Sequence, residues 1–351
     1  MRKCLCILSF TIFISSLAVC DEQPAGSNVP LFNTSQFQFY VPNGTIDVLF
    51  KENILNSDID FKTAYDYIDD YIHTDLDISY PLKHFILGIN MNDKVDFNQL
   101  FNDESTLQRS RHLKPYFGYK LTDKTSVVTS TRFQDTYTVS ITSQAVLDSG
   151  KNIVQSLGIH FDNLSKGESL SSGDMLHMDF SKSFSQLGSQ YDYTLAELSF
   201  MDITRPFLNH YLETEVFMGY PVSVIKEPIT ELYYLGGPDR MKGYSYNEFS
   251  GDATIYSGIK YHIPFTVKEH FLKTQINFLS VDFLAELGKT GTSRIYEVFD
   301  DYKADVGLGF SFDITILKRI QAKISSSIDQ AIYSKEIRYY LMFSAITYNK
   351  G

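Results

Sequence analysis

Long runs in which apolar and polar residues alternate are the feature of this sequence that most constrains its fold. From Asp305 to Ile316, every even position is apolar and every odd position is Asp, Gly, Ser or Thr. The run from Ala253 to Phe265 repeats the pattern, with Ser257 as its one exception. Successive side chains of a β-strand point to opposite faces, so these runs predict strands with one apolar and one polar face. Many exceed the roughly five or six residues of soluble strands and reach the roughly 9–11 that cross a bilayer at a tilt.

The connections between the predicted strands fall into two length classes. Short turns are predicted at Thr122-Asp123, Thr204–Pro206, Phe265–Glu269 and Thr315-Ile316, and long loops at 93–108, 223–251 and 288–302. Barrels of the bacterial outer membrane sort their connections in this way, with short turns in the periplasm and longer loops outside. A soluble β-sandwich has no reason to do so. The sequence therefore predicts an all-β fold, a transmembrane antiparallel β-barrel.

The number of strands depends on the region before residue 84. Predicted strands run from there to residue 348. Two further strands fit Leu76–Tyr80 and Ile46–Phe50, and Asp60–Ile72 fits either a strand or a helix. A closed barrel of this kind has an even number of strands. We therefore expect about 14, with 16 and 12 as the alternatives.

The N-terminus has the pattern of a secretory signal peptide. Two basic residues precede an apolar run, Cys4–Val19, and a polar segment follows it. We expect residues 1–20 to be a signal peptide, 21–35 a short periplasmic lead and 36–351 the barrel. The sequence fits ordinary cleavage after Cys20 and also lipidation of that cysteine.

Composition and motifs argue against several classes of function. The formal net charge of −11, with no basic block, argues against nucleic-acid binding. All three cysteines lie in the first 20 residues, so the predicted mature chain has no disulfide framework and no thiolate metal site. The His-x-Ser pattern of an outer-membrane phospholipase is missing at the histidines 160, 177, 210, 262 and 270. We therefore expect no catalytic residue, no metal and no cofactor.

One loop-like stretch between two predicted strands carries an unusual set of residues. A Gly-Gly turn is followed by a basic-Gly-aromatic tripeptide; these residues are Gly236, Gly237, Lys242, Gly243 and Tyr244. The stretch resembles the loop of the BamA/TamA-type outer-membrane assembly superfamily, whose signature is Gly-Gly followed by Val-Arg-Gly-Phe/Tyr. Met241 and Lys242 stand where that signature has Val and Arg. The resemblance implies an extracellular loop that folds into the barrel lumen.

A second motif resembles the strand that the superfamily places after this loop. Phe283–Gly288 is similar to Phe-x-Asp-x-Gly, with Glu286 in the place of Asp. In the superfamily the loop Arg pairs with the strand Asp, so the resemblance implies that Lys242 contacts Glu286, next to Gly288. Arg240 is an alternative partner for Glu286. The other interpretation is that Lys242 lines a solvated loop and that Glu286 faces water in the lumen.

The resemblance also implies a function. The superfamily assembles or translocates other proteins at the bacterial outer membrane, so the implied partners are outer-membrane lipid and either unfolded client proteins or a separate periplasmic accessory protein. Its assembly factors carry periplasmic POTRA domains, and residues 21–35 are too few for one, so the chain resembles a short form without them. This difference leaves a second interpretation open, a passive pore or structural surface-antigen barrel without assembly activity.

Overall fold

The structure is a computed structural model, and it describes residues 34–348 with short gaps at 42–44, 55–56, 67–70, 100–104, 165–171, 208–209, 266–268, 272–273, 292–301 and 317–319. The expected signal peptide lies outside the described residues, as does all of the expected lead except its last two residues. The first strand begins at Thr34, close to the expected start of the barrel at residue 36.

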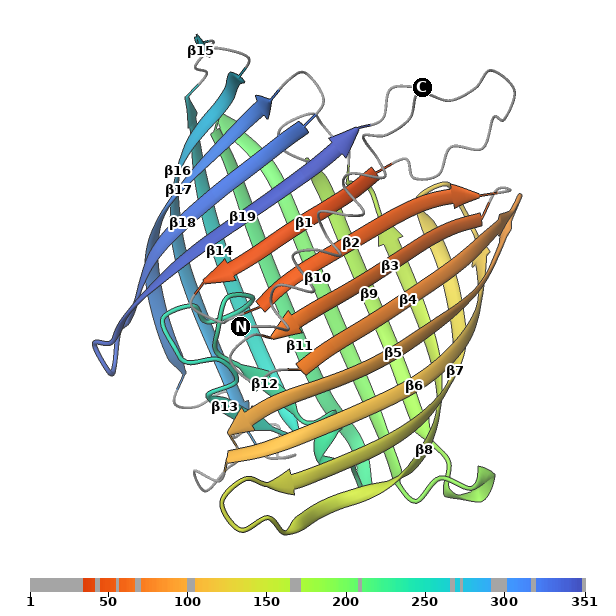
Figure 1. Ribbon diagram of the computed structural model, residues 1–351. Helices are drawn as coiled ribbons and strands as arrows, with labels where there is room; N and C mark the ends of the chain where they lie inside the picture. The colour runs from red at the N-terminus through yellow and green to blue at the C-terminus, as the bar shows by residue number, and fades with distance from the viewer. Residues whose placement is uncertain are drawn as a thin grey trace, which may run out of the picture.

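In the described residues, one antiparallel sheet of 17 strands makes up the fold, and Figure 1 shows it rolled into a barrel. Its strands are β1 (Thr34–Val41), β2 (Thr45–Ile54), β3 (Ser57–Asp66), β4 (Tyr71–Leu82), β5 (Phe85–Gln99), β6 (Ser105–Lys120), β7 (Thr125–Ser140), β8 (Val146–Asp162), β9 (Gly173–Ser183), β10 (Asp192–Phe207), β11 (His210–Lys226), β14 (Ala253–Phe265), β15 (Glu269–Phe271), β16 (Thr274–Gly291), β17 (Lys303–Ile316), β18 (Ile320–Ala331) and β19 (Ile337–Tyr348). The connections contain a small ribbon and two 3₁₀ turns: β12 (Tyr233–Leu235) pairs with β13 (Phe249–Gly251), and the turns are η1 (Ser185–Leu187) and η2 (Ile229–Glu231).

Strand β1 closes the barrel. It pairs antiparallel with β2 on one side and with β19 on the other. Among the described strands, β15 has three residues and pairs only with β16, so 17 strands less this one leave 16 in the ring. The predicted transmembrane antiparallel barrel is confirmed, and its strand number is the alternative of 16 rather than about 14. The two further strands are β1 and β3, and Asp60–Ile72, which fitted a strand or a helix, falls on β3, β4 and the connection between them.

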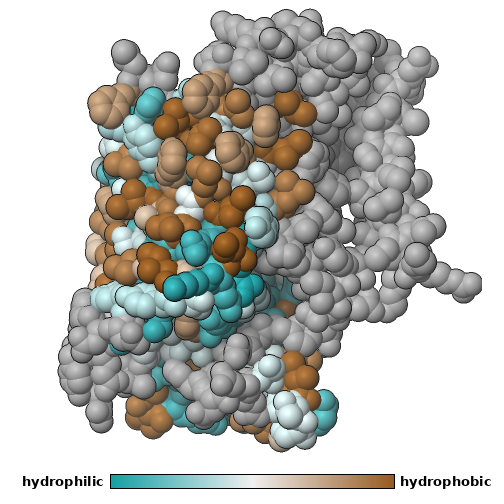
Figure 2. All heavy atoms as spheres, turned by 90° about the vertical axis from the view of Figure 1, so that its left-hand side faces the viewer, coloured by the Kyte–Doolittle hydropathy of each residue, from teal (hydrophilic) through white to brown (hydrophobic). Residues whose placement is uncertain are grey.

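The apolar and polar faces of the sheet are reversed relative to a soluble protein. Large apolar side chains such as Phe133, Leu157 and Phe310 are exposed, whereas Gln134 and Asn152 are buried toward the lumen. Figure 2 shows one part of the outer surface, where hydrophobic side chains cover most of the upper described area. A lipid bilayer favours this arrangement, because the outward face of each strand contacts acyl chains. No helix in the described part of the chain is long and apolar enough to cross a bilayer.

One of the expected long loops is wrong, and another is confirmed. The expected loop 93–108 is mostly strand, because β5 continues to Gln99 and β6 begins at Ser105. The charged residues of this segment suggested a loop, but they alternate as in a strand, and Lys94 and Asp96 face the lumen cavity. The connection between β11 and β14, residues 227–252, enters the barrel, as Figure 1 shows in teal. The prediction of a loop folded into the lumen is therefore confirmed.

Candidate functional site: a loop docked on the lumen wall

Two glycines let the lumen loop, residues 227–252, turn back on itself. Gly236 (φ +112°) and Gly237 (φ +108°) both lie in the left-handed region, which glycine adopts without steric penalty. Their N–H groups donate to the carbonyls of Arg240 (3.1 Å) and Met241 (3.3 Å). A Cβ atom on Gly236 would also clash with the carbonyl oxygen of Ser245. The Gly-Gly pair thus determines where the loop reverses.

The tip of the loop binds the barrel wall through its backbone. The Lys242 N–H donates to a carboxylate oxygen of Glu286 on β16 (2.8 Å), and the Gly243 N–H donates to Asp305 on β17 (2.6 Å). A Cβ atom on Gly243 would lie 2.6 Å from the backbone nitrogen of Ala331 and 2.7 Å from the Cβ of Asp305. Only glycine therefore allows the tip to approach the wall this closely.

An apolar cluster lies beneath the tip. It consists of Leu235, Met241, Tyr244, Tyr256 and Ala331, with Phe217 and Phe249 packed against it. Gly288 makes room for this cluster, because a Cβ atom there would lie 2.9 Å from Leu235 Cδ1 and 3.1 Å from Met241 Sδ. Met241 is fully buried although its φ of 62° is costly for a residue with a side chain. Burial of such a side chain contributes about 1.5–3 kcal/mol, which offsets a backbone cost of about 1–2 kcal/mol.

The structure corrects the predicted side-chain pair of Lys242 and Glu286. The two residues are in contact, but the donor is the Lys242 backbone N–H, and no ion pair joins the two side chains in the described part of the chain. The other oxygen of Glu286 accepts a hydrogen bond from the Tyr256 hydroxyl (2.6 Å). Both carboxylate oxygens therefore already have donors, and the ammonium group is not needed as a partner.

The predicted alternative, Arg240 as the partner of Glu286, is also corrected. The guanidinium of Arg240 binds Glu215 on β11, with Nε and Nη2 at 3.2 and 3.0 Å from Oε1. It also lies 4.0 Å from the ring centre of Phe217, a cation–π contact. Arg240 thus attaches the loop to a different strand of the wall, before the tip.

The last strand of the barrel holds the tip from another side. The Tyr340 hydroxyl donates to the carbonyl of Lys242 (2.9 Å), and the Arg338 guanidinium donates to the Ser245 hydroxyl (2.6 Å). The Tyr244 hydroxyl donates to the carbonyl of Ala304 on β17 (3.1 Å). The tip therefore joins β16, β17 and β19 into one bonded unit.

Three acidic side chains are buried next to the tip. Glu286, Asp305 and Asp329 come from the neighbouring strands β16, β17 and β18 and are 3%, 1% and 0% exposed. One oxygen each of Asp305 and Asp329 has no hydrogen-bond partner among the described residues. Burial of a carboxylate without donors is costly, so the N–H groups of the docked tip stabilise this wall as much as the wall stabilises the tip.

The other arm of the loop is attached to the opposite wall. The Arg132 guanidinium on β7 binds Glu231 of η2 (2.7 Å), and both side chains are largely buried. The Gln108 amide donates to the Tyr234 hydroxyl (2.6 Å), and the Ile229 N–H donates to Asp148 (3.1 Å). The loop is thus attached on both sides of the lumen.

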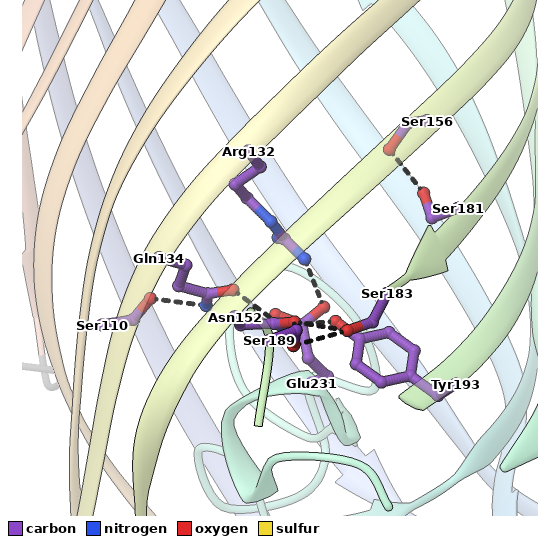
Figure 3. Close-up of polar contacts among 10 residues, drawn as sticks. All are labelled: Ser110, Arg132, Gln134, Asn152, Ser156, Ser181, Ser183, Ser189, Tyr193 and Glu231. Atoms are coloured by element: carbon purple, nitrogen blue, oxygen red, sulfur yellow. Dashed lines mark hydrogen bonds and ion pairs between the residues drawn. The ribbon is translucent and has the colours of Figure 1, made fainter. Parts of the chain in front are cut away.

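A network of neutral polar side chains lies in the wall next to this arm, and Figure 3 shows it close to Arg132 and Glu231. Asn152 is its centre: its amide nitrogen donates to Tyr193 (2.6 Å) and Gln134 (3.2 Å), and its oxygen accepts from Ser183 (2.8 Å) and Ser189 (3.2 Å). These buried groups satisfy one another, which is required for polar atoms shielded from water. The network therefore fixes the wall to which the loop is attached.

Burial raises the pKa of Glu227, a residue of the lumen loop. Glu227 lies at the start of the loop, where burial and then the nearby carboxylates of Asp252 and Glu231 raise its pKa to about 8. Its Oε1 has no hydrogen-bond partner among the described residues. The protonated, neutral form of Glu227 therefore fits this position best.

A polar cavity of about 700 Å³ remains between the loop and the wall. Charged side chains including Arg132, Glu197, Glu215 and Arg240 line it. Within the described residues, no group of three or more His, Cys, Asp or Glu side chains is arranged to hold a metal ion.

Sequence reasoning missed several residues that hold the loop. Asp305, Tyr256 and Arg338 lie on polar faces of predicted strands, but their contact with the tip depends on strand register. Asp305 is paired directly with Glu286 across β16 and β17. An acidic residue next to the small residues Gly307 and Gly309 on one strand face was the available signal.

Comparison with solved structures identifies barrels of the same fold. BamA from Haemophilus ducreyi lacking POTRA domains 1–3 is similar with a TM-score of 0.68 at 12% identity, over 89% of this chain and 69% of that one. CdiB from Escherichia coli has a TM-score of 0.64 at 10% identity, over 91% of this chain and 64% of that one. CdiB from Acinetobacter baumannii has a TM-score of 0.61 at 12% identity, over 90% of this chain and 59% of that one. This chain thus spans less than two thirds of either CdiB.

Comparison of sequences alone finds no such relationship. No protein-family model matches the chain, and no curated protein matches it significantly. At identities of 10–12%, these matches establish only that the folds are alike. The docked position of the loop is shown by its contacts with the lumen wall. The chain therefore has the fold of the BamA-type transmembrane β-barrels, with its longest described connection docked on the lumen wall.

Proposed function

We propose that this chain is an integral outer-membrane barrel that assists the insertion or transport of other proteins, in a role that involves no enzymatic chemistry. The solved barrels with this fold are outer-membrane proteins, which supports the location. Its partners would be outer-membrane lipid and either unfolded client proteins or a periplasmic accessory protein. The predicted signal peptide would direct the chain across the inner membrane.

The observation that carries this proposal is the seam at β1. This strand has 8 residues, whereas β8 and β11 each have 17. It joins the ring through the pairs from Thr34↔Tyr348 to Val41↔Leu341 and through a similarly short ladder to β2. Because the stability of a strand pair grows with the number of its hydrogen bonds, the ladders of β1 separate at lower cost than the long ones.

The docked loop makes the two sides of this seam unequal. Its tip bonds to β16, β17 and β19, so the C-terminal side of the seam is braced from within the lumen. Separation of β1 from β19 would then leave a supported strand with unpaired backbone groups. Such an edge is a template on which an extended segment of another protein can pair.

A disulfide across the seam tests this proposal. The predicted mature chain has no cysteine, so Gln38→Cys with Ser344→Cys, which are register partners on β1 and β19, introduces a single bridge. Thr131→Cys with Gln155→Cys bridges β7 and β8 in the same way and is the matched control. Cells that lack the gene are complemented with each variant, and the integral proteins of their outer membranes are quantified.

We expect deletion to lower particular outer-membrane or surface proteins, the control to restore them, and the oxidised seam variant to restore them only after reduction. Full restoration by the oxidised seam variant would contradict opening at β1. Deletion without any change in these proteins would contradict the assembly role itself.

A passive barrel is the second candidate, and the polar cavity beside the loop favours it. A polar chamber of about 700 Å³ in the lumen is compatible with a plugged pore that needs no client. Planar-bilayer recordings distinguish the two roles: a steady ohmic conductance, with no loss of other proteins on deletion, would support the passive pore.

A further inference from the structure

The outer surface of β5–β8 carries an ordered row of charges directly beside an apolar band. The two faces of these strands are distinguished by contact with the lumen loop, since Gln108 and Arg132 bind it and so face inward. Residues of the opposite parity, such as Phe85, Phe117 and Phe133, are exposed on the outside. The charged residues of the row occupy positions of this second set, so their side chains also point outward.

Strand register aligns two outward rows. The apolar row consists of side chains directly paired across the four strands: Met91, Leu113, Phe133 and Ile153. The next outward row, two residues further toward the loop side of the barrel, is charged throughout: Asp93, Arg111, Asp135 and Lys151. Apolar outward residues thus give way to charged ones within one step of the pleat, as at the boundary between acyl chains and headgroups.

Arginine is in excess at one end of the charged row. Asp93 accepts Nε and Nη2 of Arg109 at 3.2 and 3.0 Å, and Nε of Arg111 at 3.0 Å. The side chains of Arg109 and Arg111 are 44% and 55% exposed. Each guanidinium has more N–H donors than these bonds use, and both are oriented by the shared carboxylate.

The local charge is positive although the chain is acidic. Arg109, Arg111 and Lys151 supply three positive charges against two from Asp93 and Asp135, which leaves one positive charge (3 − 2) on a chain with a net charge of −11. Tyr137 is paired with Arg109 and is 45% exposed, and tyrosines are enriched at the membrane–water interface.

We propose that Arg109 and Arg111 form a binding site for the phosphorylated headgroup of a lipid in the outer leaflet. Arginine binds phosphate oxygens through paired N–H donors, and the apolar row below would contact the acyl chains of the same lipid. A free phosphate would use only the arginines, whereas a lipid uses both rows. The site lies on β5 and β6, which are neighbouring strands in Figure 1.

The test compares two lipids that differ only in their phosphates. The full-length protein in detergent micelles is mixed with diphosphorylated lipid A or with the dephosphorylated form, and bound lipid is counted by native mass spectrometry. We expect the phosphorylated lipid to bind roughly tenfold to a hundredfold more tightly, and this preference to be lost in Arg109→Gln/Arg111→Gln. Lys120→Gln/Lys124→Gln removes the same charge at the opposite end of β6 and in the turn that follows it, and should keep the preference.

Heat-modifiable mobility on gels shows that each variant is folded. Equal binding of the two lipids by the wild type would overturn the proposal, as would a preference that survives in the arginine variant. Equal loss in the lysine control would assign the effect to net charge rather than to this site. Inorganic phosphate that binds as tightly as the diphosphorylated lipid would show that the acyl chains contribute nothing and would overturn the lipid assignment.

Discussion

Replacement of Gly243 by alanine should detach the tip of the lumen loop. The new Cβ atom would lie 2.6 Å from the backbone nitrogen of Ala331 and 2.7 Å from the Cβ of Asp305, and both belong to the wall of the barrel. Neither can move without displacing a strand, so the loop must withdraw. The tip would then lose the bond from Gly243 N–H to Asp305 (2.6 Å) and the bond from Lys242 N–H to Glu286 (2.8 Å).

The size of the effect follows from these two bonds. Hydrogen bonds to charged groups contribute about 1.5–3 kcal/mol each, so the docked state should lose about 3–6 kcal/mol. A loss of about 3 kcal/mol corresponds to roughly a hundredfold more frequent opening. Hydrogen exchange in micelles should therefore show the amides of residues 236–248 exchanging at least roughly a hundredfold faster, while amides of the ring strands keep their protection.

A matched substitution separates this effect from the general cost of removing a glycine. Gly118→Ala on β6 places its Cβ no closer than 3.4 Å to any neighbour, an ordinary contact, and should leave loop exchange unchanged. Wild-type protection of the loop in Gly243→Ala would refute the docking geometry.

Three further results are expected from the loop contacts. Glu286→Ala should weaken docking of the loop by about 3 kcal/mol, because the Tyr256 hydroxyl and the Lys242 N–H lose their acceptor. Lys242→Ala should change the free energy of docking by less than about 1 kcal/mol. Strong coupling between the two substitutions in a double-mutant cycle would contradict this and show that the ammonium group pairs with Glu286. Arg132→Met should leave Glu231 buried without its partner and destabilise attachment of the other arm of the loop by about 3–5 kcal/mol. Protease cleavage near η2 should increase as a result. Unchanged cleavage would contradict the ion pair. The folded state holds the proton of Glu227 more tightly than the unfolded state, so docking of the loop should weaken as pH rises from about 4.5 to about 8 and then level off. Glu227→Gln should lose this pH dependence. A loop that becomes more protected over that pH range would contradict the raised pKa of Glu227.

Much of the ring could be predicted from the sequence because the bilayer imposes a simple pattern. On β17, Val306, Leu308 and Phe310 alternate with small or acidic residues, and such a run is long enough to span a membrane. Strand β1 also alternates, with Phe37 and Phe39 on either side of Gln38, but its 8 residues fall short of that length. The short seam strand was therefore the hardest part of the ring to recognise.

The site was predictable in its glycines and less so in its partners. Gly236, Gly237 and Gly243 are determined by local backbone geometry and close approach, which a motif preserves. The partner of Arg240 depends on which strand the loop passes on its way to the wall, and the sequence holds no signal for the choice of Glu215 over Glu286. The sequence suggested that the side chain of Lys242 contacts Glu286, but the contact is made by its backbone N–H. Every residue except proline has such an N–H, so the residue type at this position gives no signal for the bond.

Fractionation of the cells shows whether the chain spans the outer membrane as a closed barrel. We predict that the mature protein sediments with outer membranes, resists extraction by carbonate and urea, and migrates faster on gels when it is left unheated. Release as a soluble periplasmic protein, with the same mobility before and after heating, would contradict it.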